Sequence, residues 1–354
     1  MGKLKEFLKR KDIVFSPKRY GIDALGAMAQ GLFCSLLVGT IVKTLGQQLA
    51  LDFLVQVGDF ASAMSGAAMA IAIGYALKAP AMVLFSLAAV GYATDSLSAL
   101  TLFGEKGAGG PLAVFFVAIV AAECGKAVSK ETKVDILVTP ITTILVGVGL
   151  AALIAAPIGK AAMAVGDAIK WATGQQPFLM GILVSVIVGI ALTLPISSAA
   201  ICAALGLTGL AGGAAVAGCC AQMVGFAVMS FKENRWGGLV AQGIGTSMLQ
   251  MPNIMKNIRI WIPPTVASAI TGPLATCLFK LEMNGAPVSS GMGTCGFVGQ
   301  IGVITGWADK TVTAMDWIGL VLICFVLPAI ISWALCELLR KVGWIKENDL
   351  KLDL

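Results

Sequence analysis

The sequence contains no histidine among its 354 residues. This absence excludes Ser-His-Asp and Cys-His catalysis, histidine zinc sites and a phosphohistidine on this chain. Charged residues make up only 12%, whereas a soluble domain carries about a quarter. The nine cysteines form no C-x-x-C pair, which is typical of small buried side chains in a compartment that keeps thiols reduced. We therefore predict no catalytic residue, no metal site and no cofactor.

Hydrophobic residues make up 58% of the sequence. A soluble fold this apolar could not cover its own core, so we predict that a lipid bilayer surrounds the protein. We expect an all-α, polytopic transmembrane transporter with about ten spans, in a range of about nine to twelve. The clearest apolar windows are residues 24–42, 111–128, 136–158, 178–205 and 318–335.

The net charge of +6 arises from 25 basic and 19 acidic residues. Seven of the basic residues precede the first span, in MGKLKEFLKRKDIVFSPKRY. By the positive-inside rule, this distribution predicts a cytoplasmic N-terminus rather than a nucleic-acid-binding protein. The following span is too long for a signal peptide. The basic segment could also recognise a specific lipid or a partner.

Two series of apolar segments resemble each other. GLFCSLLVG at 31–39 pairs with GILVSVIVG at 181–189, and IGYAL at 73–77 pairs with VGFAV at 224–228. LAAVGYATDSL at 87–97 pairs with LVAQGIGTSML at 239–249, so the offset drifts only from 150 (181 − 31) to 152 (239 − 87). We predict an internal duplication of five helices per half, arranged as an inverted repeat, as in many secondary transporters.

The resulting domain organisation has five parts. If the connector at residues 157–177 also crosses the membrane, the two halves are parallel rather than inverted. We interpret this connector as an interfacial helix. The parts are a cytoplasmic basic segment (1–19), a first transmembrane repeat (20–156), an interfacial connector (157–177), a second repeat (178–308), and a last helix with a charged tail (309–354).

Two Gly-containing polar segments occupy corresponding positions in the halves, VGYATDSLS at 90–98 and QGIGTSMLQMPN at 242–253. Paired broken segments of this kind are the best sequence indication of a transporter's binding site, because exposed backbone groups at membrane depth must line a cavity or be buried in protein. The alternative is two ordinary loops at the membrane surface. The first segment contributes the candidates Thr94, Asp95 and Ser96, and the second contributes Gln242, Thr246, Ser247, Gln250 and Asn253.

Other polar residues lie in apolar surroundings. Gln222 and Gln300 each need a partner, which could be a solute or another helix. Asp95 could bind a solute hydroxyl or a coupling proton, or it could lie at the interface. Glu123 and Lys126 are three residues apart, which predicts a helical ion pair. We interpret Lys256, Arg259 and Trp261, just after the second polar segment, as interfacial anchors.

Long blocks of the second half, such as LPISSAAICAALGLTGLAGGAAVAGCCAQMVGFAVMSFKEN, IWIPPTVASAITGP and GMGTCGFVGQIG, resemble the second-type phosphotransferase system (PTS) enzyme IIC family. This family includes membrane proteins labelled as perfringolysin-type toxin regulators. The resemblance implies a sugar permease (EIIC) subunit in a bacterial cell membrane, a homodimer, and separate EIIA and EIIB proteins that supply phosphoryl groups. The Glu-containing motifs G-I-T-E-P and N-E-P of better-known sugar EIIC proteins are absent here.

Two other functions remain open from the sequence. The chain could be a membrane sensor or regulator that binds a ligand without moving it. It could also be a secondary transporter that couples a proton or sodium ion at Asp95 and involves no phosphorylation.

Overall fold

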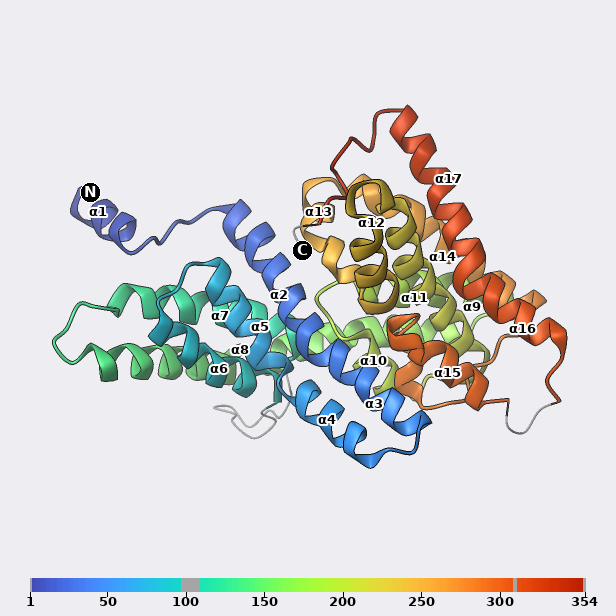
Figure 1. Ribbon diagram of the computed structural model, residues 1–354, viewed down its shortest axis with the longest axis horizontal. Helices are drawn as coiled ribbons and strands as arrows, with labels where there is room; N and C mark the ends of the chain where they lie inside the picture. Colours follow the sequence, from blue (N-terminus) through green and yellow to red (C-terminus); the bar gives the residue numbers. More distant parts are fainter. Residues whose placement is uncertain (1, 97–108, 308–310, 353–354) are drawn as a thin grey trace. The chain divides into compact units, whose positions relative to one another are not determined.

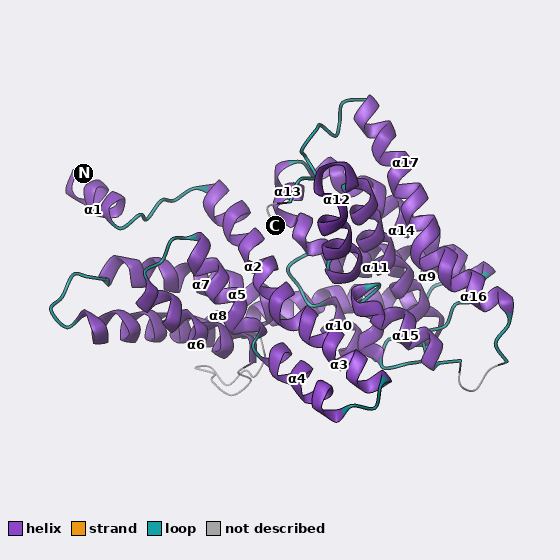
Figure 2. Ribbon diagram, in the orientation of Figure 1, coloured by secondary structure: helices purple, strands orange, loops and turns teal. Residues whose placement is uncertain are grey.

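The computed structural model describes residues 2–96, 109–307 and 311–352. Its described elements are α, 3₁₀ and π helices (Figure 1), and these residues form no strand, only an isolated antiparallel bridge between Gly209 and Met283 (Figure 2). The chain divides into two compact units, Met1–Ala162 and Met163–Leu354. The predicted all-α class is therefore confirmed.

The first unit is built around α5. This helix packs against α2, α6 and α7, and its contact with α6 is close enough for backbone to meet backbone. A Cβ atom on Gly91 would lie 2.1 Å from the carbonyl oxygen of Gly66, so only glycine fits there. The helices are α1 (Gly2–Arg10), α2 (Ala24–Leu32), α3 (Val38–Gln48), α4 (Asp52–Ala63), α5 (Ser65–Ala76), α6 (Ala81–Ser96), α7 (Gly110–Val128) and α8 (Asp135–Thr173), with π turns at Arg19–Asp23 and Phe33–Leu37. The residues of α8 from 163 onward belong to the second unit.

The second unit surrounds α11, which contacts α9, α14 and α17. Small residues allow this close packing, since a Cβ atom on Gly218 would lie 1.9 Å from the carbonyl oxygen of Ser185. The α helices are α9 (Pro177–Thr193), α10 (Ser198–Ala204), α11 (Gly209–Met229), α12 (Phe231–Val240), α13 (Met251–Lys256), α14 (Ile262–Pro273), α15 (Val298–Thr305), α16 (Ala314–Val321) and α17 (Leu327–Lys341). Short 3₁₀ segments at Ser247–Gln250, Ile258–Trp261, Pro287–Gly291 and Cys295–Phe297, and π turns at Ala241–Gly245, Leu274–Leu278 and Leu322–Val326, join them.

Five helices among the described residues are long and apolar enough to cross a membrane, and the pair α4–α5, bent by 46°, would make a sixth. Their outward faces are apolar too: Phe53 is 74% exposed, Ile136 is 71% exposed and Leu145 is 68% exposed. Such side chains are stable at the surface when lipid covers them. The five helices are Arg19–Gln48, Gly110–Val128, Asp135–Thr173, Gly209–Met229 and Ala314–Lys341.

The total of about ten spans and the inverted repeat remain predictions, whereas one apolar window is corrected. Residues 178–205 do not form one helix, because α9 ends at Thr193 and α10 begins at Ser198. Pro195 lacks a backbone N–H and disfavours helical geometry at the residue before it, and Leu194 is extended with φ −70° and ψ 158°. Four other windows lie within helices of spanning length.

Two further segments differ from expectation. Residues 90–96 lie inside α6, so the expected break is not found there, and residues 97–98 lie outside the described part of the chain. Gly91 instead permits the close contact with α5. The connector expected at 157–177 is continuous with α8 as far as Thr173. Its interfacial position stays a prediction.

Candidate functional site

The second polar segment is broken, as its sequence predicts. Residues Ala241–Gly245 form a π turn, Thr246 is extended with φ −159°, and a 3₁₀ turn then leads into α13. The hydroxyl of Thr246 accepts a hydrogen bond of 3.2 Å from the backbone N–H of Met248 and thus caps that turn. Pro252 lies in the first turn of α13, where its missing N–H costs no helical hydrogen bond.

Gln222 lies on α11 and is fully buried. Its carbonyl oxygen Oε1 accepts hydrogen bonds from the hydroxyl of Thr193 at 3.3 Å and from the indole N–H of Trp261 at 2.9 Å. Thr193 also shares a hydrogen bond of 2.8 Å with the hydroxyl of Ser247. Two predicted site residues, Gln222 and Ser247, therefore meet at one hydroxyl group.

The amide nitrogen of Gln222 is held less tightly than its carbonyl oxygen. It donates to Thr265 at 3.3 Å and to Ser268 at 3.5 Å, both longer than the roughly 2.9–3.0 Å usual for such bonds. A solute hydroxyl could therefore replace either acceptor at small cost. We call the following residues the Gln222 cluster: Thr193, Gln222, Ser247, Trp261, Thr265 and Ser268.

Three other predicted residues form a separate amide ladder. Gln242 donates to the hydroxyl of Ser230 at 2.8 Å, Gln250 donates to Oε1 of Gln242 at 2.9 Å, and Asn253 donates to Oε1 of Gln250 at 2.9 Å. All four side chains are buried. Since each amide carbonyl on Gln242 and Gln250 accepts from the next residue, the ladder is a continuous chain of hydrogen bonds.

The segment after α17 folds back onto this ladder. Gln250 donates to the backbone carbonyl of Leu350 at 3.0 Å, and Asn253 donates to that of Lys351 at 2.8 Å. Asn234 contributes from α12, donating to Leu350 O at 2.8 Å and accepting from Leu352 N–H at 2.8 Å. The ladder therefore binds an extended stretch of the protein's own backbone.

All three residues interpreted as interfacial anchors have partners inside the second unit. The indole N–H of Trp261 belongs to the Gln222 cluster, and the guanidinium of Arg259 lies 5.2 Å from the ring centroid of Trp344. Lys256 donates to the side-chain oxygen of Asn253 at 3.3 Å. The sequence interpretation missed the contacts of Trp261 and Arg259 because their partners lie far away along the chain.

Gln300 lies on α15 and is 5% exposed. Its amide nitrogen contacts the sulfur of Cys220 at 3.1 Å, while its carbonyl oxygen has no hydrogen-bond partner among the described residues. An unsatisfied buried acceptor costs about 1–3 kcal/mol, so this oxygen is suited to receive a hydrogen bond from a solute or a water molecule.

In the first unit, Thr94 donates to the carbonyl oxygen of Val90, one turn earlier in its own helix, at 2.8 Å. Asp95 accepts a hydrogen bond of 2.5 Å from Ser65, the first residue of α5. The side chain of Ser96 lies outside the described residues. Thr94 is thus satisfied locally, and Asp95, in the last turn of α6, contacts the start of α5, which follows a bend.

The predicted ion pair between Glu123 and Lys126 is present, with a distance of 3.0 Å. Lys126 is 2% exposed, and its ammonium also donates to the backbone carbonyls of Asp12 at 2.8 Å and Leu77 at 2.9 Å. Tyr20 donates to the other oxygen of Glu123 at 3.1 Å. These bonds attach the N-terminal segment to α7.

Residues missed by the sequence interpretation include Thr193, Thr265, Ser268 and the stretch around Leu350. Thr193 carried a usable signal, because it is a polar residue in an apolar run just before Pro195. The sequence around Ser268 and Leu350 gave no such signal, because the roles of these residues depend on packing between distant segments.

Apolar outer faces around a buried polar interior define an α-helical integral membrane protein. Comparison with known families matches residues 22–352 to the family described as Phosphotransferase system, EIIC, and the chain belongs to this family. Comparison with curated proteins and with solved structures gives no match. Family membership identifies the chain as a membrane component of sugar transport.

Proposed function

We propose that the protein is the EIIC permease subunit of a sugar phosphotransferase system and that the Gln222 cluster is part of its solute site. The supporting observation is chemical: four of the six cluster residues are buried, Trp261 and Thr265 are half-buried, and the cluster is rich in hydroxyl and amide groups and contains no ionisable side chain. A buried site without a countercharge disfavours an ionic solute and suits a neutral one. The indole ring of Trp261 adds an apolar surface against which a sugar ring can pack.

Separate EIIA and EIIB proteins complete the proposed system. The chain has no histidine, so a histidine that carries the phosphoryl group must belong to a partner. We place the protein in the bacterial plasma membrane as a homodimer with a cytoplasmic N-terminus, in keeping with the seven basic residues before the first span. Its halves are proposed to form an inverted repeat.

The remaining predicted residues differ in how directly they could contact a solute in this proposal. Gln300 offers an unoccupied buried acceptor and Thr246 shapes the turn that carries Ser247. Gln242, Gln250 and Asn253 are engaged by the Leu350 segment, and a solute would reach them only after that segment moves. Thr94, Asp95 and Ser96 remain candidates from the first unit.

The test is sugar uptake by protein reconstituted into liposomes, with a panel of labelled sugars and with EIIA, EIIB and phosphoenolpyruvate present or absent. Removing the hydrogen-bonding groups in Gln222→Leu or Thr193→Val should reduce the uptake rate about tenfold or more. Thr305→Val is the matched control, because Thr305 is exposed and donates only within its own helix, to Ile301 O.

Wild-type uptake rates in both cluster variants would show that the site assignment is wrong. Uptake that follows the membrane potential rather than phosphoenolpyruvate would favour the ion-coupled alternative, for which the partly buried Asp95 carboxylate is the relevant observation. Sugar binding without uptake under any condition would favour the sensor alternative.

A further inference from the structure

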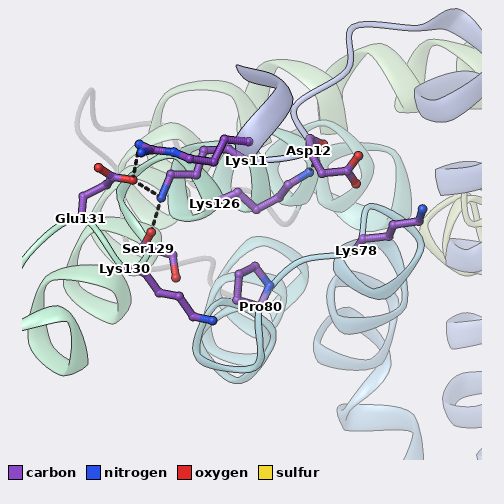
Figure 3. A pocket seen from close by; sticks show the side chains of 9 residues that line it. Lys11, Asp12, Lys78, Pro80, Lys126, Ser129, Lys130 and Glu131 are labelled. Carbon is purple, nitrogen blue, oxygen red and sulfur yellow. Dashed lines mark hydrogen bonds and ion pairs between the residues drawn. The ribbon is translucent and has the colours of Figure 1, made fainter. Parts of the chain in front are cut away.

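A basic pocket of about 380 Å³ lies in the first unit, where the N-terminal segment meets the α5–α6 and α7–α8 connections (Figure 3). Five of its nine lining residues are lysine or arginine and two are acidic. Its lining therefore carries an excess of three positive charges. Such an excess in a small concave space favours an anionic ligand.

Both acidic residues of the lining already have basic partners. Glu131 lies 2.7 Å from Arg10 and 2.5 Å from Lys11, and Figure 3 shows the Lys11 side chain reaching toward it. Asp12 lies 2.6 Å from Arg19, a residue outside the lining. The two carboxylates are thus unable to neutralise the rest of the pocket.

The remaining lysines differ in their contacts. Lys126 is paired with Glu123 and bonded to backbone carbonyls. Lys78 and Lys130 have no carboxylate within ion-pair distance in the part of the chain that the structure describes. Their two ammonium groups account for two of the three excess charges, and the third arises because Arg10 and Lys11 share the single carboxylate of Glu131.

Both unpaired lysines have left-handed backbone conformations. Lys78 follows α5 with φ 56° and Lys130 follows α7 with φ 59°, and the neighbouring Asp12 has φ 53°. Glycine is the residue that fits this position after a helix without strain. Strained non-glycine residues tend to collect at functional sites, and three of the eight described here line one pocket.

The pocket lies at the ends of helices that are apolar enough to cross the bilayer: α7 is a candidate span, and α5 completes the bent pair. Lipid headgroups occupy this level, and basic pockets between transmembrane helices are known to bind them. A headgroup phosphate can accept hydrogen bonds from two ammonium groups at once.

We propose that this pocket binds a phosphate group, supplied by the headgroup of an anionic lipid, and that the unpaired positive charges of Lys78 and Lys130 attract it. The site is separate from the solute site of the second unit and does not depend on which solute is transported. It would select for lipids that carry a net negative charge.

The experiment equilibrates the purified full-length protein with phosphatidylglycerol or phosphatidylcholine and counts retained lipids by native mass spectrometry. Wild type should retain phosphatidylglycerol in preference to phosphatidylcholine. The double variant Lys78→Gly/Lys130→Gly should bind phosphatidylglycerol about thirtyfold more weakly, about fivefold for each lysine. Because glycine relieves the left-handed strain, this variant should fold at least as well as one with glutamine at both positions, which is measured alongside.

The matched control is Lys18→Gln/Lys133→Gln, which removes two exposed positive charges from the same unit without touching the lining. It should bind phosphatidylglycerol within about twofold of wild type. Equal retention of phosphatidylglycerol by wild type and both pocket variants would overturn the proposal. So would equal losses in the pocket variants and the control, because net charge alone would then explain the binding.

A second arm distinguishes the source of the phosphate. Inorganic phosphate is titrated into the protein in phosphatidylcholine while the thermal midpoint is followed. A pocket-dependent rise without retention of phosphatidylglycerol would overturn the lipid source and assign the site to a small soluble phosphate. Retention of phosphatidylglycerol without any response to inorganic phosphate would support the lipid.

Discussion

Asp95 shows how one side chain can resemble a transport site and still have a structural partner. Its carboxylate accepts from Ser65 at the first turn of α5, just after the bend between α4 and α5. The N-terminus of a helix carries partial positive charge, so a carboxylate there is stabilised by about 0.3–1 kcal/mol. The sequence indicated an intramembrane acid, but its cap-like position depends on the contact of Gly66 with Gly91, which no local pattern predicts.

Glu131 is the surface residue whose titration should affect the fold. The hydrogen bond from Lys11 holds the pKa of Glu131 below its usual range, and the hydrogen bond from Arg19 likewise lowers the pKa of Asp12. Because both pKa values are depressed on folding, the ionised groups stabilise docking of the N-terminal segment above their ordinary pKa values. This stabilisation is lost as the pH falls through the folded-state pKa values.

We therefore expect hydrogen exchange of residues 7–13 to be slow at pH 7 and to accelerate once the pH falls below about 4. The measurement is hydrogen exchange with mass spectrometry, corrected for the intrinsic pH dependence of exchange. Glu131→Gln should weaken protection at pH 7 and make the pH response smaller. An unchanged pH response in this variant would contradict the assignment to Glu131.

Among the elements, the segment after α17 fixes the geometry of the broken stretch from 241 to 257. Leu350 is fully buried while its backbone accepts from Gln250 and Asn234. Asn257 donates to Trp344 O at 2.9 Å and to Asp349 at 2.7 Å, and these bonds hold the part of the segment that precedes Leu350. Side-chain amides therefore replace the backbone hydrogen bonds that a regular helix would have made.

Truncating Leu350 should loosen this attachment. Leu350→Ala removes a buried side chain and should cost about 2–5 kcal/mol of stability in the second unit. The loss is measured as a lower thermal midpoint and as faster hydrogen exchange at residues 242–257. Leu338→Ala is the control, because Leu338 is 55% exposed and should change the midpoint little. Equal effects of the two substitutions would argue against the role of Leu350.

The sequence predicted the elements to different degrees. Long apolar runs identified α7 and α8 because a spanning helix needs only a continuous apolar stretch. The break at 242–253 was predicted from Gly243, Gly245 and Pro252, which act locally. The division of the polar residues into a Gln222 cluster and an amide ladder was not predictable, because it depends on Thr193, Trp261 and Leu350 reaching the segment from other helices.

For the whole molecule, the two units each bury their own polar groups. The proposed inverted repeat can be tested by the side of the membrane on which two connections lie. If the halves are inverted, the charged connections KAVSKETK and FKENR face opposite sides of the membrane. Both contain exposed lysines, Lys133 and Lys232.

We expect single cysteines at Lys133 and Lys232 to react with a membrane-impermeant maleimide from opposite sides of oriented vesicles. Wild type serves as the background control for its nine native cysteines, of which six are buried. Labelling of both positions from the same side would contradict the inverted arrangement and indicate parallel halves.

The attachment of Leu350 also sets an order of events during synthesis. Leu350 is added 100 residues after Gln250, so the ribosome reaches it about 5 to 20 seconds later. Throughout that interval Gln250 and Asn253 lack the backbone carbonyls of Leu350 and Lys351 as acceptors, and α17 must be made before those acceptors arrive. Until then, water or the insertion machinery must accept the hydrogen bonds of these amides. The second unit is therefore completed only when residues 350–352 pack over a segment made long before.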